Sequence, residues 1–141
     1  MMIRDIHKAI IASLFIGLPL LSFAKRYDVT LPEVASYLKT AQPGDQIYIK
    51  DGQYKDMQLK WMGKGTEKSP ISIKALNPGK VKIEGGSTLR IAGEWISVDG
   101  LYFTDGYAPK GSVIEFRNGQ ELANHCRLTN CVIDKFNPSR R

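Results

Sequence analysis

The chain has 141 residues, of which 43% are hydrophobic, 20 are Lys or Arg and 14 are Asp or Glu. This length suits one modest domain and is small for an enzyme with a long substrate cleft. Because there are only two cysteines, a scaffold built on disulfides is excluded, and the dispersed basic residues argue against nucleic acid as a partner. The net charge of +6 suits a polyanionic partner, but an ordinary solvated surface can carry the same excess.

The first 24 residues have the pattern of a signal peptide. Arg4 and Lys8 precede an apolar stretch over residues 9–21, and small residues before Lys25 fit cleavage after Ala24. The stretch is shorter than the ~20 apolar residues that a membrane-spanning helix needs. We therefore expect a secreted or periplasmic protein that is not held in the membrane after cleavage.

One helix is expected near the start of the mature chain, residues 25–141. Thr30 followed by Glu33 forms a capping box, and Pro32 in the first turn also marks a helix start. Apolar residues then lie on one face until a Pro-Gly pair ends the pattern. This predicts a short amphipathic helix over residues 31–40.

From Gln46 onward the pattern changes to short β-type runs separated by turn residues, such as Asp51-Gly52 and Asp99-Gly100. Short strands with frequent turns fit either a sandwich of hairpins or a repeat fold. The predicted strands cover residues 46–50, 71–75, 80–83, 88–92, 95–98, 101–104, 113–117 and 126–133.

An internal repeat favours a β-solenoid over the sandwich. When segment 95–103 is laid over segment 125–133, four apolar positions coincide, and Gly100 coincides with Asn130 at the bend. Like positions in successive coils of a solenoid stack in its core. The overlay therefore predicts inward ladders of eight residues and two buried free thiols rather than a disulfide. These residues are Ile96, Val98, Leu101, Phe103, Cys126, Leu128, Cys131 and Ile133.

Four segments resemble the N-terminal coils of polysaccharide lyase family 6, which includes alginate lyases and chondroitinase B. They are PGDQIYIKDGQYKD (43–56), SPISIKALNPGKVKIEGGSTLRIAG (69–93), WISVDGLYFTDGY (95–107) and NHCRLTNCVIDKFNP (124–138). The last segment is closer to the alginate lyases. The resemblance implies an all-β fold, a right-handed parallel β-helix with a short N-terminal capping helix, of which residues 25–141 form a truncated N-terminal part.

The resemblance also implies that the complete protein is an exported lyase that cleaves alginate, a polymer of mannuronate and guluronate, by β-elimination. In this reaction a cation such as calcium or a guanidinium neutralises the uronate carboxylate, a Lys removes the C5 proton and an Arg supports the leaving C4 oxygen. In the family these groups lie on later coils. No catalytic, cofactor-binding or metal-ligating residue is therefore assigned here, and calcium is expected only in the complete protein.

Two alternatives to an alginate lyase remain open. One is a chondroitinase B-like lyase of dermatan sulfate, and the other is a non-catalytic β-helix module that binds acidic polysaccharide. The chain stops soon after a core strand without a second cap, which favours the N-terminal part of an enzyme over a finished module. We expect the chain alone to be inactive.

Individual polar residues suit structural roles better than chemical ones. His125 is expected to face outward at a strand start rather than to act as a base. The carboxylates of Asp99, Asp105, Glu115 and Asp134 offer oxygen ligands for calcium, yet Asp99 and Asp105 precede glycines and suit turns.

Aromatic and basic side chains offer further candidates for contact with a polysaccharide. Trp61, Trp95, Tyr102 and Tyr107 are candidates for stacking on sugar rings, with packing as the other interpretation of Trp95. Lys135, Arg140 and Arg141 could touch a polyanion but fit an ordinary solvated run better. The segment 63–66 lacks the spacing of a phosphate loop and is discarded.

Overall fold

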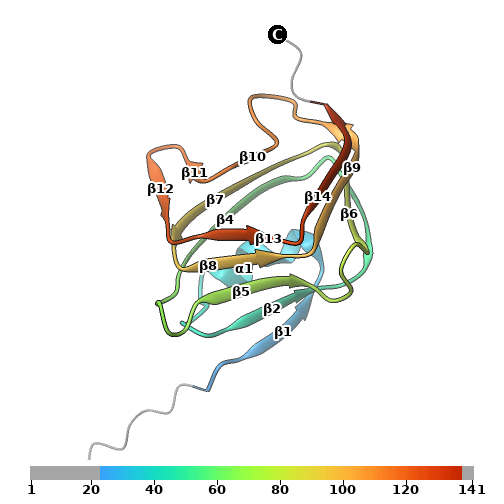
Figure 1. Cartoon of the computed structure of the whole chain (residues 1–141). Coiled ribbons are helices and arrows are strands. Elements are labelled where there is room, and N and C mark those ends of the chain that lie inside the picture. Colours follow the sequence, from blue (N-terminus) through green and yellow to red (C-terminus); the bar gives the residue numbers. More distant parts are fainter. Residues whose placement is uncertain (1–22, 138–141) are drawn as a thin grey trace, which may run out of the picture.

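The chain folds into coils of short parallel strands stacked along one axis (Figure 1). The computed structural model describes residues 23–137, so all but the last two residues of the expected signal peptide lie outside the described part. Sheet A runs β1 (Arg26–Val29), β2 (Gln46–Ile49), β5 (Ile71–Ala75), β8 (Ile96–Asp99) and β13 (Arg127–Thr129). The long sequence gaps between neighbouring strands are those of a solenoid, because each strand pairs with its counterpart one coil later.

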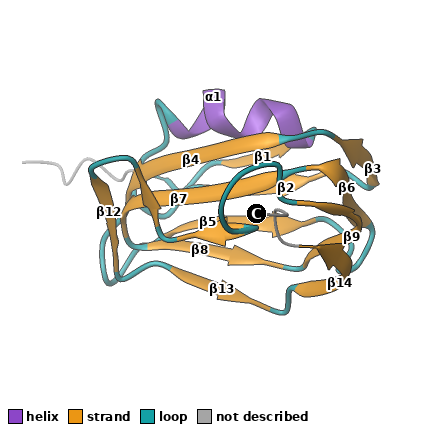
Figure 2. Cartoon of the chain, turned by 90° about the horizontal axis from the view of Figure 1, so that it is seen from above, coloured by secondary structure: helices purple, strands orange, loops and turns teal. Residues whose placement is uncertain are grey.

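Sheets B and C complete each coil. Sheet B contains β3 (Gly52–Lys55), β6 (Val81–Gly86), β9 (Leu101–Tyr107) and β14 (Val132–Asn137). Sheet C contains β4 (Gln58–Lys64) and β7 (Thr88–Glu94), and β7 also pairs with β10 (Ile114–Glu115) and β12 (Glu121–Asn124). The short β11 (Arg117–Asn118) pairs antiparallel with β12. Seen from above, the three sheets surround a common interior (Figure 2).

The core consists of side chains at equivalent positions of successive coils. On sheet A, Ile47 pairs in register with Ile73, which pairs with Val98, and all three are buried. On sheet C, Trp61 pairs with Ile91, and both are fully buried. The parallel β-solenoid predicted from the sequence is therefore confirmed.

The predicted register between the last two coils is also confirmed, but the expected burial is only partly correct. Leu128 pairs with Val98 and Ile133 pairs with Phe103, as the overlay of the two segments requires. Ile96, Val98, Leu101 and Phe103 are buried, whereas Cys126, Leu128 and Cys131 are partly buried and Ile133 is 52% exposed. The last four lie on the last described coil, so among residues 23–137 they have a coil on one side only.

The predicted helix exists but is shorter and begins as a 3₁₀ turn. The turn η1 (Leu31–Glu33) leads into α1 (Val34–Leu38). The Glu33 carboxylate accepts hydrogen bonds from the backbone N–H (2.7 Å) and the hydroxyl (2.8 Å) of Thr30. Leu31, Val34 and Leu38 are buried, and α1 packs mainly against β4 (Figure 2). The helix thereby closes the core beside the first coil.

Several strand boundaries differ from the predicted ones. The predicted strand over residues 113–117 is split into β10 and β11, and the predicted strand over residues 126–133 is divided into β13 and β14. The second division lies at Asn130, whose φ of 50° turns the chain from sheet A to sheet B. The strands β1, β3, β4 and β12 were not predicted.

Candidate functional site

A groove of about 530 Å³ lies on the outer face of sheet C. Its lining residues on β4 and β7 form the floor, and those of the segment that connects β9 to β12 form the other side. Figure 1 shows this segment running beside β7. It is lined by Gln58, Lys60, Thr88, Arg90, Lys110, Gly111, Glu115 and Gly119. Side chains on a strand point alternately inward and outward, so the core residues Leu59 and Trp61 alternate with Gln58 and Lys60 in the groove.

Arg90 connects the floor of the groove to this segment. Its guanidinium donates hydrogen bonds to the backbone carbonyls of Ser112 (2.9 Å) and Lys110 (3.4 Å). Its Nε lies 3.4 Å from Glu115 Oε2, and the Arg90 side chain is only 16% exposed. A guanidinium with several fixed donors suits such a linking role. Arg90 therefore holds the segment at residues 110–115 against β7.

The groove has an excess of positive charge. Its lining contains three cationic side chains, Lys60, Arg90 and Lys110, and one carboxylate, that of Glu115. The carboxylate is paired with Arg90, whereas Lys60 and Lys110 form no ion pair within the described residues. Two unpaired ammonium groups in one hollow give an environment suited to an anion.

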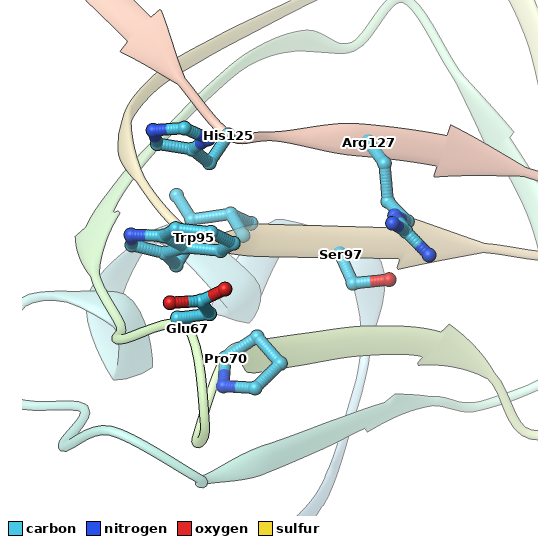
Figure 3. Close-up of a pocket in the computed structure, with 7 residues that line it drawn as sticks. Glu67, Pro70, Trp95, Ser97, His125 and Arg127 are labelled. Atoms are coloured by element: carbon cyan, nitrogen blue, oxygen red, sulfur yellow. The ribbon is translucent and has the colours of Figure 1, made fainter.

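A smaller pocket of about 200 Å³ lies where sheet C turns into sheet A. Its lining includes Glu67, Pro70, Trp95, His125 and Arg127. Figure 3 shows the Trp95 ring between His125 and Glu67, and the Arg127 side chain reaching from β13 toward Ser97 on β8. The pocket is smaller than the ~300–1,000 Å³ typical of ligand sites.

The smaller pocket is built on an aromatic stack. The rings of Trp95 and His125 have centroids 4.1 Å apart and an interplanar angle of 7°. The two residues stand at equivalent turns of successive coils with φ of 52° and 54°. His125 is exposed and faces outward, as predicted. Because His125 covers a face of Trp95, packing rather than sugar stacking explains this tryptophan.

The carboxylates considered for calcium have separate partners. Asp99 Oδ2 accepts hydrogen bonds from the Thr129 hydroxyl and the Asn130 amide, both at 2.7 Å, and thus links two coils at a turn. Asp105 accepts a hydrogen bond from the Thr104 hydroxyl, and Asp134 accepts one from the Tyr102 hydroxyl. Glu115 forms an ion pair with Arg90. Within residues 23–137, no group of three or more His, Cys, Asp or Glu side chains is arranged to hold a metal ion.

The remaining aromatic and basic candidates are dispersed. Trp61 is fully buried, so it cannot stack on a sugar, and its indole Nε1 has no hydrogen-bond partner among residues 23–137. Tyr102 donates to Asp134 at 3.4 Å, and Tyr107 is 51% exposed. Lys135 is exposed on β14, while Arg140 and Arg141 lie outside the described residues.

Segment 63–66 and the two thiols have structural roles. The Gly65 N–H donates to the Glu94 carbonyl at 2.8 Å, so it is not available to a phosphate. Cys126 and Cys131 are free, as predicted, although only partly buried. Burial raises the pKa of both thiols, which favours the unreactive protonated form.

The groove residues Lys60, Arg90 and Lys110 were not identified from the sequence. Lys60 and Arg90 are paired in register on β4 and β7, so a second overlay of the kind made for segments 95–103 and 125–133 could have brought them together. Lys110 lies in an irregular segment, and no periodic pattern points to it.

The structural elements of the described part include no helix that is long and apolar enough to cross a membrane. No curated protein matches the sequence. The sequence model of the family described as chondroitinase B matches residues 30–141.

Solved structures of family 6 lyases match the fold closely. The alginate lyase AlyGC superposes with a TM-score of 0.72 and 43% identity over 77% of this chain and 15% of that one. A mannuronic-acid-specific lyase from human gut microbiota superposes with a TM-score of 0.69 and 34% identity, over 77% of this chain and 26% of that one. A lyase from Pseudopedobacter saltans superposes with a TM-score of 0.66 and 31% identity, over 77% of this chain and 24% of that one. This chain thus spans 15–26% of the length of these relatives. Family membership follows from the parallel β-solenoid, from the family match over residues 30–141 and from these structural neighbours. The chain belongs to the chondroitinase B family, polysaccharide lyase family 6.

Proposed function

We propose that the chain forms the N-terminal coils of an exported lyase that cleaves alginate by β-elimination. The observation that carries the proposal is the 43% identity to a family 6 alginate lyase, at a TM-score of 0.72, over 77% of this chain. The basic groove on sheet C supports a polyanionic substrate. Export is supported by the signal-peptide pattern of residues 1–24.

β-Elimination from a uronate requires several groups around one sugar ring. The carboxylate must be neutralised, a base must take the C5 proton, and the C4 oxygen must be stabilised as it leaves. These groups must be held within a few ångströms of their reacting atoms. The four carboxylates considered for calcium, those of Asp99, Asp105, Glu115 and Asp134, have separate partners, and no group of three or more metal-binding side chains comes together within residues 23–137. We therefore assign no chemical step to this part of the chain.

The described residues have two functions within this proposal. The segment η1–α1 covers the first coil with Leu31, Val34 and Leu38, which protects the end of the core from water. The sheets provide a rigid support on which the outer side chains are fixed. Catalysis belongs to the coils of the complete protein that lie beyond the matched region.

The test is the action of the complete protein on two uronate polymers. The unsaturated uronate product absorbs in the ultraviolet, so cleavage can be followed continuously with alginate and with dermatan sulfate, each with and without a calcium chelator. Cleavage of alginate in preference to dermatan sulfate supports the proposal. Preferential cleavage of dermatan sulfate establishes the second candidate, which the chondroitinase B family match favours. A complete protein that binds alginate without cleaving it is the non-catalytic module.

A further inference from the structure

We propose that the groove on sheet C is a binding subsite for a uronate residue of the polysaccharide, with Lys60 and Lys110 as its carboxylate-binding groups. This inference rests on the proposed function, because it takes the ligand to be an alginate oligosaccharide. The site is formed by β4, β7 and the segment after β9, and it is a place where the polysaccharide is held rather than cut.

The charges of the groove select an acidic ligand. The pairing of Glu115 with Arg90 leaves the ammonium groups of Lys60 and Lys110 without an ionic partner among the described residues. An ammonium group that meets a carboxylate forms a charge-assisted hydrogen bond, which is about twice as strong as a neutral one. A neutral glucan offers these two groups only hydroxyl oxygens and no opposite charge, so it is bound more weakly.

The two lysines are held in place by different parts of the fold. Lys60 lies on β4, which pairs with β7 along its whole length. Lys110 lies in the segment after β9, and its backbone carbonyl accepts a hydrogen bond from the Arg90 guanidinium. Because Arg90 also binds the Ser112 carbonyl and Glu115, the segment is fixed before any ligand arrives. A site that is already ordered loses less entropy on binding.

The neutral residues of the groove suit the hydroxyl groups of a sugar. Thr88 donates its hydroxyl hydrogen to Gln58 Oε1 at 2.9 Å, and Gln58 Nε2 donates to the Gly86 carbonyl at 2.8 Å. Both side chains are therefore oriented, and the Thr88 oxygen can still accept a hydrogen bond from the ligand. Cations beside fixed hydroxyl and amide groups match a uronate, which carries a carboxylate beside its hydroxyls.

The size of the groove separates it from the pocket at Trp95. The groove has a volume of about 530 Å³, which falls within the ~300–1,000 Å³ range of ligand sites. The Trp95 pocket has about 200 Å³, and the His125 ring covers a face of its main aromatic residue. Of these two hollows, only the groove offers both the space and the charge for a sugar acid.

The test is titration calorimetry of the 141-residue chain with short alginate oligosaccharides at physiological ionic strength. The groove variant is the double substitution Lys60→Gln and Lys110→Gln. The control variant is Lys39→Gln and Lys80→Gln, which removes the same charge from two exposed lysines that do not line the groove. We expect the groove variant to bind at least about tenfold more weakly, the loss typical of one charge-assisted hydrogen bond. The control variant should bind as the unchanged chain does, and a neutral dextran should bind to none of them.

A second measurement is the reactivity of the lysines toward an acetylating reagent. Alginate oligosaccharides should protect Lys60 and Lys110 and leave Lys39 and Lys80 reactive. Equal binding by the groove variant and the unchanged chain would overturn the inference, as would an equal loss in the control variant or no binding at all. None of these results would bear on the proposed lyase, since cleavage by the unchanged complete protein is measured separately.

Discussion

The buried carboxylate of Asp45 gives a sharp test of how the N-terminal strand is attached to the first coil. Asp45 is 1% exposed. Its Oδ1 accepts a hydrogen bond from the Lys25 backbone N–H and its Oδ2 accepts one from the Gln42 N–H, both at 2.9 Å. The substitution Asp45→Asn replaces one acceptor oxygen by an NH₂ group, so a donor then faces a donor.

The expected loss follows from the unsatisfied donor. A buried polar group without a partner costs about 1–3 kcal/mol, which is a large share of the ~5–15 kcal/mol that stabilises a typical domain. Each kcal/mol lowers Tm by roughly 4–8 °C in a domain of about 60–100 residues and by roughly 2–4 °C in one of about 150–250 residues, so a shift of about 4 °C per kcal/mol is expected for this chain. If cleavage occurs after Ala24, the Lys25 nitrogen becomes the charged amino terminus. The loss should then be greater in the mature chain than in the uncleaved one, because hydrogen bonds of ions are stronger.

Thermal and urea unfolding followed by circular dichroism measure this loss. The matched control is Asp28→Asn, which changes a 47% exposed carboxylate in a surface ion pair with Arg26. Such pairs contribute only ~0–1 kcal/mol, so the control should unfold close to the unchanged chain. If Asp45→Asn is no less stable than Asp28→Asn, the assignment of a structural role to the buried carboxylate is wrong.

Two further perturbations test the core and the helix. Val98→Asp should abolish cooperative unfolding, because an unpaired buried charge costs several kcal/mol. Leu128→Asp, at the same ladder position on the partly exposed last coil, should lower the stability less. An equal loss of stability in the two variants, measured by circular dichroism during unfolding, would contradict the difference in burial between Val98 and Leu128. The hydrogen bonds from the Thr30 backbone and hydroxyl lower the pKa of Glu33. This carboxylate therefore stabilises the fold at pH values above its unfolded pKa, and the contribution is lost as pH falls through the lowered folded pKa. Glu33→Gln should therefore lose less stability than the unchanged chain as the pH falls. If the free energy of unfolding depends on pH equally in both, this role of Glu33 is refuted.

The repeat was predictable because it depends on residue types at fixed spacing. The overlay of segments 95–103 and 125–133 yields the register of β8 with β13 and of β9 with β14. The capping box at Thr30 and Glu33 likewise marks the helix. The degree of burial was not predictable, because the exposure of Ile133 depends on what covers its coil rather than on its position in the strand.

The missed strand and the missed groove have a common cause. In β4 the core residues Leu59 and Trp61 alternate with exposed polar residues such as Lys60, and this alternation was not recognised as a strand. Without β4, its pairing with β7 and the juxtaposition of Lys60 with Arg90 were also missed. Lys110 joins them through hydrogen bonds of Arg90 to backbone carbonyls, an interaction that leaves no pattern in the sequence.

We propose that these coils support and bind the polymer, whereas β-elimination takes place on coils beyond them. This proposal is tested most directly by comparing the ultraviolet absorbance of alginate incubated with the 141-residue chain and with the complete protein. We predict a steady rise with the complete protein and none with the chain alone, because residues 23–137 do not bring together the groups that β-elimination needs. A rise that scales with the concentration of the chain alone would place catalytic residues within it and refute this division between binding and catalysis.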